Sequence, residues 1–114
     1  MKLKEGTPKI KIWIETETGS IFGPGVYSIL KSIIDNGSIS ATCRKLEISY
    51  TKAWSKIKVT EERLGVTIIK RKRGGTNGGG SIITQEGKEL MDTYEKYASE
   101  VQSKSLCIFK KYFD

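Results

Sequence analysis

A helical stretch near the middle of the chain carries the side chains best suited to recognising another molecule. Over residues 50–64, a helical projection places four polar or basic side chains on one exposed face: Thr51, Lys52, Ser55 and Lys58. Such side chains at the start of a helix can reach base edges in the major groove of duplex DNA. Ser49 and Tyr50, where the helix begins, can meet a phosphate beside unpaired backbone N–H groups. Each of these residues would also suit an ordinary solvated helix face.

A basic run and a glycine-rich loop follow this helix. The run consists of Lys70, Arg71, Lys72 and Arg73, and the loop at 74–80 reads GGTNGGG. Successive side chains of a strand alternate in direction, so two of the four charges can face DNA. Thr76 and Asn77 are the hydrogen-bonding side chains of the loop. This pattern predicts a hairpin wing on the DNA backbone or in the minor groove, with a salt dependence of about 0.9 in log–log slope per neutralised phosphate.

The same loop could instead cradle the phosphate of a nucleotide in an enzyme. That interpretation requires a Gly-Lys-Ser/Thr sequence with a helix directly after it, and neither is found in the sequence. The chain contains no histidine, so histidine-based catalysis is excluded and a zinc site at Cys43 or Cys107 is not expected. We therefore predict that the chain is not an enzyme and binds no cofactor or metal.

The net charge of +7 is concentrated in one part of the 114-residue chain. Residues 44–73 carry ten basic and three acidic side chains, whereas the segments before and after them are close to neutral. A basic patch of this kind predicts a polyanionic partner. Since no apolar run approaches the ~20 residues that span a bilayer, no membrane association is expected. Two cysteines without a secretory signal predict a cytoplasmic protein.

The apolar pattern predicts the elements that position these side chains. Residues 9–18 alternate in the manner of one half-buried strand, through Ile10, Ile12 and Ile14. A turn is expected at 19–25, followed by helices over 26–36 and after Ser38, the latter capped by Ser38 or Ser40. The expected apolar stripes of these two helices are Val26, Leu30, Ile33 and Ile34, and Ile39, Cys43 and Leu46. In the third helix, capped by Ser49, the expected core side is Ala53, Ile57 and Leu64 with Trp54 at its edge.

The remaining segments predict a wing and a long helix. Residues 66–72 and 81–84 have the composition of two short strands, and a helical pattern runs from Gln85 to the end. If Ser105 fills one gap, its apolar residues follow 3- and 4-residue steps: Leu90, Tyr94, Tyr97, Val101, Ile108 and Tyr112. This stripe is longer than a small core can cover, so we predict that it joins two chains in a homodimer. Packing on its own domain is the alternative.

Two segments carry a resemblance to a known family. GSISATCRKLEISYTKAW and ERLGVTIIKRKRGGTNGGGSIITQEGKELM resemble the N-terminal DNA-binding domain of ModE-type molybdate-responsive regulators, which are related to LysR-type proteins. Most specific are EISYTKAW and the glycine-rich wing followed by IITQEG. The resemblance implies a winged helix-turn-helix homodimer that binds a palindromic operator, with residues 49–58 as the recognition helix and residues 71–80 as the wing.

Two departures from the family pattern limit what carries over. Glu47 stands where the motif usually has glycine, so the turn must accept a left-handed non-glycine residue at a cost of about 1 kcal/mol. The molybdate-binding domains are not in this sequence, so molybdate binding is not expected.

We therefore predict a single α+β unit that acts as a sequence-specific regulator on double-stranded DNA. A winged helix-turn-helix covers 1–84 and a dimerisation helix covers 85–114. A winged-helix module that binds another protein, its basic face unused for DNA, is the alternative. RNA binding is disfavoured, because single-strand readers usually offer a platform of aromatic residues and here most aromatics lie in the last helix.

Overall fold

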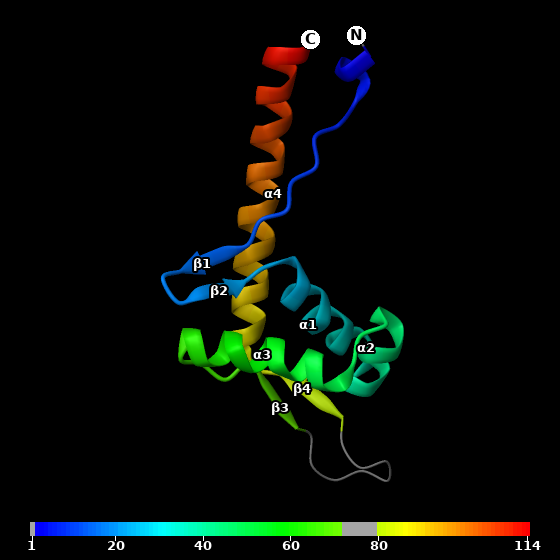
Figure 1. The fold of residues 1–114 in the computed structure, drawn as a ribbon, viewed down its shortest axis with the longest axis vertical. Helices are drawn as coiled ribbons and strands as arrows, with labels where there is room; N and C mark the ends of the chain where they lie inside the picture. The colour runs from blue at the N-terminus through cyan, green and yellow to red at the C-terminus, as the bar shows by residue number, and fades with distance from the viewer. Residues whose placement is uncertain (1, 72–79) are drawn as a thin grey trace.

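The computed structural model describes residues 2–71 and 80–114, and it confirms the predicted α+β class (Figure 1). Two small antiparallel hairpins accompany four α-helices, and each hairpin forms its own two-stranded sheet. The elements in chain order are a 3₁₀ turn η1 (Lys2–Glu5), β1 (Ile14–Thr16), β2 (Gly19–Phe22), α1 (Pro24–Asn36), α2 (Ile39–Leu46), α3 (Tyr50–Leu64), β3 (Ile69–Arg71), β4 (Ser81–Ile83) and α4 (Gln85–Phe113).

Local capping chemistry determines where the helices begin and end. Ser38 and Ser49 each accept a backbone N–H in the first turn of the next helix, from Ala41 at 3.0 Å and from Lys52 at 3.1 Å. Ser49 was the predicted cap and Ser38 was one of the two candidates with Ser40, and the predicted bounds of the third helix are confirmed. Helix α1 begins at Pro24, inside the segment described as a turn from the sequence, where a proline in the first turn sacrifices no helical hydrogen bond.

The turn between α2 and α3 contains the one non-glycine residue with a positive φ among the described residues. Glu47 has φ 56° and ψ 45°, so the left-handed conformation predicted for it is confirmed. The Cys43 carbonyl accepts the N–H groups of both Glu47 and Ile48, the latter at 3.1 Å. This pair of hydrogen bonds offsets the conformational cost, since it satisfies a carbonyl that the helix end would leave unpaired.

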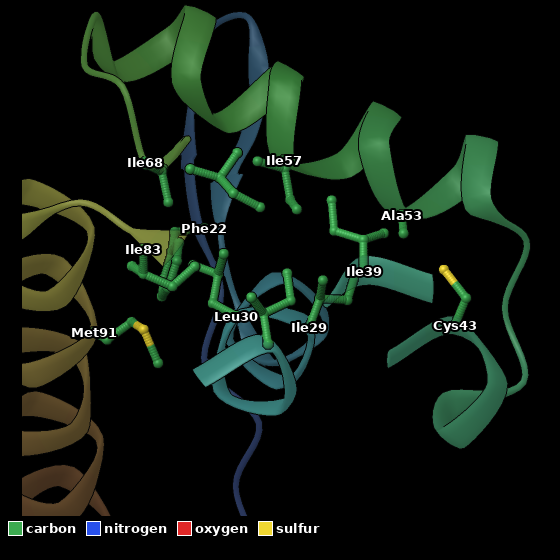
Figure 2. Packing of buried hydrophobic residues seen from close by; sticks show 12 residues of the cluster. Phe22, Ile29, Leu30, Ile39, Cys43, Ala53, Ile57, Ile68, Ile83 and Met91 are labelled. Carbon is green, nitrogen blue, oxygen red and sulfur yellow. The ribbon is translucent and has the colours of Figure 1, made fainter. Parts of the chain in front are cut away.

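The core lies between the first three helices, the β3–β4 ladder and the start of α4. Figure 2 shows Ala53 and Ile57 on the side of α3 that faces this core, with Met91 entering from α4. Two predicted core positions are wrong, because Ile34 is 46% exposed and Leu64 is 36% exposed. Ile29 and Thr60, which were not predicted as core residues, are buried.

The N-terminal segment differs from its prediction. Residues 9–18 do not form one half-buried strand, since β1 is short and exposed, and the segment predicted as a turn supplies β2. Ile10 and Ile14 are exposed, whereas Phe22 at the end of β2 is buried. Ile10 and Ile12 precede β1 as extended chain beside α4, whereas Ile14 pairs with Phe22 in the two-stranded sheet but stays exposed.

A tight junction joins the wing to α4. The Thr84 hydroxyl donates to the Thr67 carbonyl at 2.6 Å and accepts the Gly87 N–H at 3.1 Å, so one side chain ties the entry to β3 to the first turn of α4. A Cβ on Gly87 would meet the Ile83 Cγ2 at 2.7 Å and the Ile68 carbonyl oxygen at 3.0 Å. Close approach of the Ile83 side chain and of the Ile68 side chain and backbone therefore explains the glycine in the IITQEG segment.

We expect Gly87→Ala to destabilise the fold by about 1–3 kcal/mol, because the added methyl overpacks the junction against the buried side chains of Ile83 and Ile68 and the Ile68 backbone. Alanine stabilises a helix by about 1 kcal/mol relative to glycine, so the expected loss of stability opposes the change in helix propensity. Thr93→Ala, at an exposed position of α4, is the control and should be neutral or slightly stabilising. Urea unfolding measures both, and equal stability of Gly87→Ala and wild type would contradict the packing.

Helix α4 extends beyond the compact part of the molecule, whose longest dimension is 58 Å (Figure 1). The N-terminal segment runs back along it, and both termini lie at the end of α4 farthest from β3 and β4. The Tyr94 hydroxyl donates to the Ile12 carbonyl at 2.7 Å, and the Gln102 Nε2 donates to the Pro8 carbonyl at 2.6 Å. Leu90 and Tyr94 pack on the core. Two residues of the predicted dimer stripe therefore have partners within their own chain.

Candidate nucleic-acid interface

Helix α3 presents its predicted reading face to solvent. Thr51, Lys52, Ser55 and Lys58 are all exposed, while Ala53 and Ile57 on the opposite side are fully buried. Thr60, one turn further on, donates to the Ile21 carbonyl at 2.7 Å and so ties α3 to β2. The orientation of α3 about its own axis is therefore fixed, and its polar face cannot turn inward.

Two of the predicted contact residues lie at the base of the wing, in β3. Ile69 and Ile83 are paired across the ladder and buried, whereas Lys70 and Arg71 are exposed. Consecutive side chains of a strand point to opposite faces, so Arg71 lies on the same face as Ile69 and Lys70 on the other. Four predicted contact residues, Lys72, Arg73, Thr76 and Asn77, lie outside the described residues.

The wing is attached to the helix-turn-helix by backbone contact. The Ser81 N–H donates to the Gly37 carbonyl at 3.0 Å, at the turn between α1 and α2. A Cβ on Gly80 would come within 2.9 Å of that same carbonyl oxygen. The returning strand therefore passes directly against the turn, which sets the angle between the wing base and the helices.

Aromatic and cationic side chains from α3 and β3 meet at the wing base. Trp54 has the Lys58 Nζ 5.3 Å and the Arg71 guanidinium carbon 5.6 Å from its ring centroid. Tyr50 lies edge-on to Trp54 with ring centroids 6.2 Å apart, and its hydroxyl accepts from Arg71 at 3.5 Å. Together with Ile69 these residues line one groove. The sequence placed Trp54 only at the edge of the core; its contact with a residue 17 positions away leaves no signal in helical periodicity.

Glu61 connects the C-terminal half of α3 to the start of β3. Its carboxylate accepts the N–H of Ile68 at 2.7 Å and of Ile69 at 3.2 Å, and it pairs with Lys58 at 3.0 Å. Burial of the carboxylate opposes ionisation, but these hydrogen bonds and the lysine outweigh that effect, so the pKa of Glu61 is lowered below its ordinary value. Lys58 is therefore shared between Glu61 and Trp54 before any ligand arrives.

A depressed carboxylate pKa contributes stability above the unfolded-state pKa, and that contribution is lost as the pH falls through the folded-state pKa. We expect Glu61→Gln to lower the free energy of unfolding by about 1–2 kcal/mol at neutral pH, since hydrogen bonds to a charged acceptor are lost. The difference from wild type should shrink as the pH falls through the lowered pKa of Glu61, because the carboxyl then becomes uncharged like the glutamine. Urea unfolding over a series of decreasing pH values measures this. Glu62→Gln, exposed and adjacent, is the control, and a pH-independent difference would contradict the pairing.

Two further basic residues of α3 were not predicted as contacts. Lys56 and Arg63 line a second groove with Ser55 and residues of β2 and α1. Arg63 donates to the Ser20 carbonyl, which fixes it against β2. Lys56 is exposed and lies next to the first turn of α1. Positive charge therefore flanks the reading face on the β2 side as well as on the wing side.

Other kinds of site find no support in the part of the chain that the structure describes. Within residues 2–71 and 80–114 no three His, Cys, Asp or Glu side chains gather as metal ligands would. None of the helices described is both long and apolar enough to cross a bilayer.

Comparison with known proteins places this arrangement in a family. The model of bacterial regulatory helix-turn-helix proteins of the lysR family matches residues 27–88, which run from α1 through the wing to the start of α4. The molybdenum-pterin-binding protein MopB of Rhodobacter capsulatus is 32% identical over 94 residues, covering 82% of this chain and 34% of MopB. The dual regulator ModE of Escherichia coli K12 is 34% identical over 82 residues, covering 72% of this chain and 31% of ModE.

The molybdenum transport protein ModE of Azotobacter vinelandii is 27% identical over 90 residues and shows the same pattern of coverage. This chain thus spans about a third of the length of these relatives. The predicted resemblance to ModE-type regulators is confirmed over that part. With the family model matching more than half of its residues, the chain belongs to the lysR family of bacterial regulatory helix-turn-helix proteins.

Proposed function

We propose that the chain is a sequence-specific transcriptional regulator, not an enzyme, that binds double-stranded DNA as a homodimer. One observation carries the DNA-binding part. The reading face of α3 and the basic base of the wing are contiguous, since Tyr50, Trp54 and Lys58 of α3 share one groove with Arg71 of β3. A helix in the major groove and a wing on the flanking backbone require this arrangement.

The proposed roles follow from exposure and charge. Thr51, Lys52 and Ser55 enter the major groove, where their short or flexible side chains reach base edges. Ser49, Tyr50, Lys58, Lys70 and Arg71 contact phosphates, which position the helix without reading sequence. Lys72, Arg73, Thr76 and Asn77 continue the wing contact in this proposal. These contacts suit a bacterial transcriptional regulator that binds DNA in the cytoplasm.

The proposed homodimer rests on the exposed apolar residues of α4. Tyr97 is 53%, Ile108 57% and Tyr112 70% exposed, and they recur at helical spacing beyond the part of α4 that packs on the core. A second copy would cover them and present a second reading helix. A dimer with two-fold symmetry would read a palindromic operator.

Selection of bound sequences from a pool of random duplexes tests the proposal, followed by affinity measurements on the selected sequence over a range of salt. We expect a palindromic sequence and an affinity that falls steeply with salt, by about 0.9 in log–log slope for each neutralised phosphate. No binding even at low salt would overturn DNA recognition. A single non-repeated half-site would overturn the dimeric arrangement.

A second candidate function is a winged-helix module that binds another protein through α4. The exposed apolar residues of α4 favour it, since an unrelated partner could cover them as well as a second copy could. Failure to bind duplex DNA at low salt, together with a monomeric state, would favour this candidate. The names of MopB and of the Azotobacter vinelandii ModE refer to molybdenum, but this chain matches only about a third of their length, so molybdenum binding is not carried over to it.

A further inference from the structure

We propose that Trp54 is a positioning residue that holds Arg71 of the wing in place for a DNA phosphate. This inference rests on the proposed function. Trp54 belongs to α3, whereas Arg71 is the last described residue before the segment 72–79. The contact of their side chains, 5.6 Å from guanidinium carbon to ring centroid, links the reading helix to the wing. Trp54 thereby makes the two DNA-contacting elements one unit.

The way in which Arg71 is held keeps its charge available. Neither of the two ion pairs among the described residues includes Arg71; they join Lys58 to Glu61 and Lys96 to Asp92. An aromatic face attracts a guanidinium through its quadrupole but occupies none of the in-plane N–H donors. A guanidinium stacked in this way can still form a bidentate contact with a phosphate. A carboxylate in the same place would compete with the phosphate.

Lys58 shares the same ring but is bound differently. Its Nζ lies 5.3 Å from the ring centroid and 3.0 Å from a carboxylate oxygen of Glu61. Part of its charge is therefore already satisfied within α3. The aromatic contact thus has its larger consequence at Arg71, whose other polar contact is the long 3.5 Å hydrogen bond to the Tyr50 hydroxyl.

The chemistry of the indole favours a role beyond packing. The Trp54 Nε1–H is buried and has no acceptor among residues 2–71 and 80–114. A buried unpaired donor destabilises a protein, so phenylalanine would fill the edge of the core at lower cost. What indole offers that phenylalanine lacks is a larger and more electron-rich face, which binds cations best among the aromatic side chains.

A double-mutant cycle tests the coupling, with affinity for the selected duplex as the readout. We expect Trp54→Leu to weaken binding by about 3- to 10-fold and Trp54→Phe by less. Combined with Arg71→Ala, Trp54→Leu should add little further loss, because the residue that it positions is already gone. Thermal unfolding confirms that each variant is folded. The proposal would be overturned if the fold-losses in affinity of the two single variants multiply in the double variant. It would also be overturned if Trp54→Leu binds with unchanged affinity.

Fluorinated tryptophan provides a second test that leaves the fold intact. The chain has two tryptophans, so Trp13→Phe leaves Trp54 as the only site of incorporation. Each fluorine withdraws electron density from the ring at almost constant size, which weakens the attraction to cations. We expect affinity to fall stepwise with the number of fluorines, and this trend should vanish in the Arg71→Ala variant. A flat series would overturn the proposal, whereas a wild-type chain that binds no duplex would count against the proposed function.

Discussion

Replacing Lys52 and Arg71 together by alanine is expected to weaken the affinity for the selected duplex by roughly 100-fold, since two charge-assisted contacts of about 1.5 kcal/mol each are lost. Lys52 lies on the reading face of α3 and Arg71 on the wing base, and both are exposed. Each single replacement should cost about 10-fold, and the double replacement should lower the log–log salt slope by about 1, because Arg71 neutralises a phosphate whereas Lys52 reaches a base edge. Fluorescence anisotropy over a range of salt measures both quantities.

The control for this experiment changes the same number of charges at the opposite end of the molecule. Lys4 belongs to η1 and Lys110 to the last turns of α4, and Figure 1 shows both elements far from β3 and β4. Their replacement by alanine should leave the salt slope nearly unchanged. If both double variants lose affinity equally, binding depends only on net charge, and the assigned interface is wrong.

The helices and their ends were predictable because their signals are local. The bounds of α3, the serine caps and the left-handed Glu47 each depend on residues within one turn of chain. The apolar stripe of α2 was also correct, since Ile39 and Cys43 are buried. Because α2 has only eight residues, its single apolar stripe determines which side of the helix packs on the core.

Errors arose where contacts are distant in sequence. Alternating isoleucines near the N-terminus predicted a half-buried strand, but this segment is fixed by hydrogen bonds to Tyr94 and Gln102 of α4, more than 80 residues later. The exposed Leu64 and Ile34 reflect a second limit. Periodicity identifies a stripe without showing how far the neighbouring elements extend along it, and Leu64 lies in the last turn of α3, next to Gly65.

The candidate interface was predicted one element at a time. The reading face and the basic run were each visible in the sequence, but the contact between Trp54 and Arg71 depends on how β3 packs against α3. That packing is held by Glu61, whose carboxylate binds two backbone N–H groups of the segment entering β3. Charge patterning alone would assign Glu61 to solvent, since it neighbours Glu62 in the sequence.

Helix α4 divides its surface between its own chain and a free flank. At about 100° per residue, Met91, Tyr94 and Gln102 lie on the side that meets the core and the N-terminal segment. Tyr97 and Ile108 lie on an adjoining side, well exposed in one chain. The predicted dimer stripe therefore shares only its first residues with the surface of α4 that packs on its own chain. The exposed part of the stripe begins at Tyr97.

Replacing Ile108 by lysine is expected to raise the dissociation constant of the dimer by roughly 30-fold or more, because a charge in an apolar contact between two chains costs about 2 kcal/mol or more. Ser103→Lys adds the same charge at an exposed position roughly 140° around the helix, and should leave the dimer intact. Sedimentation equilibrium measures both. The Ile108 variant should also lose affinity for a palindromic duplex while keeping its affinity for a single half-site, since the reading helix is unaltered. A dimer of wild-type strength in Ile108→Lys would show that this flank of α4 faces something other than a second copy.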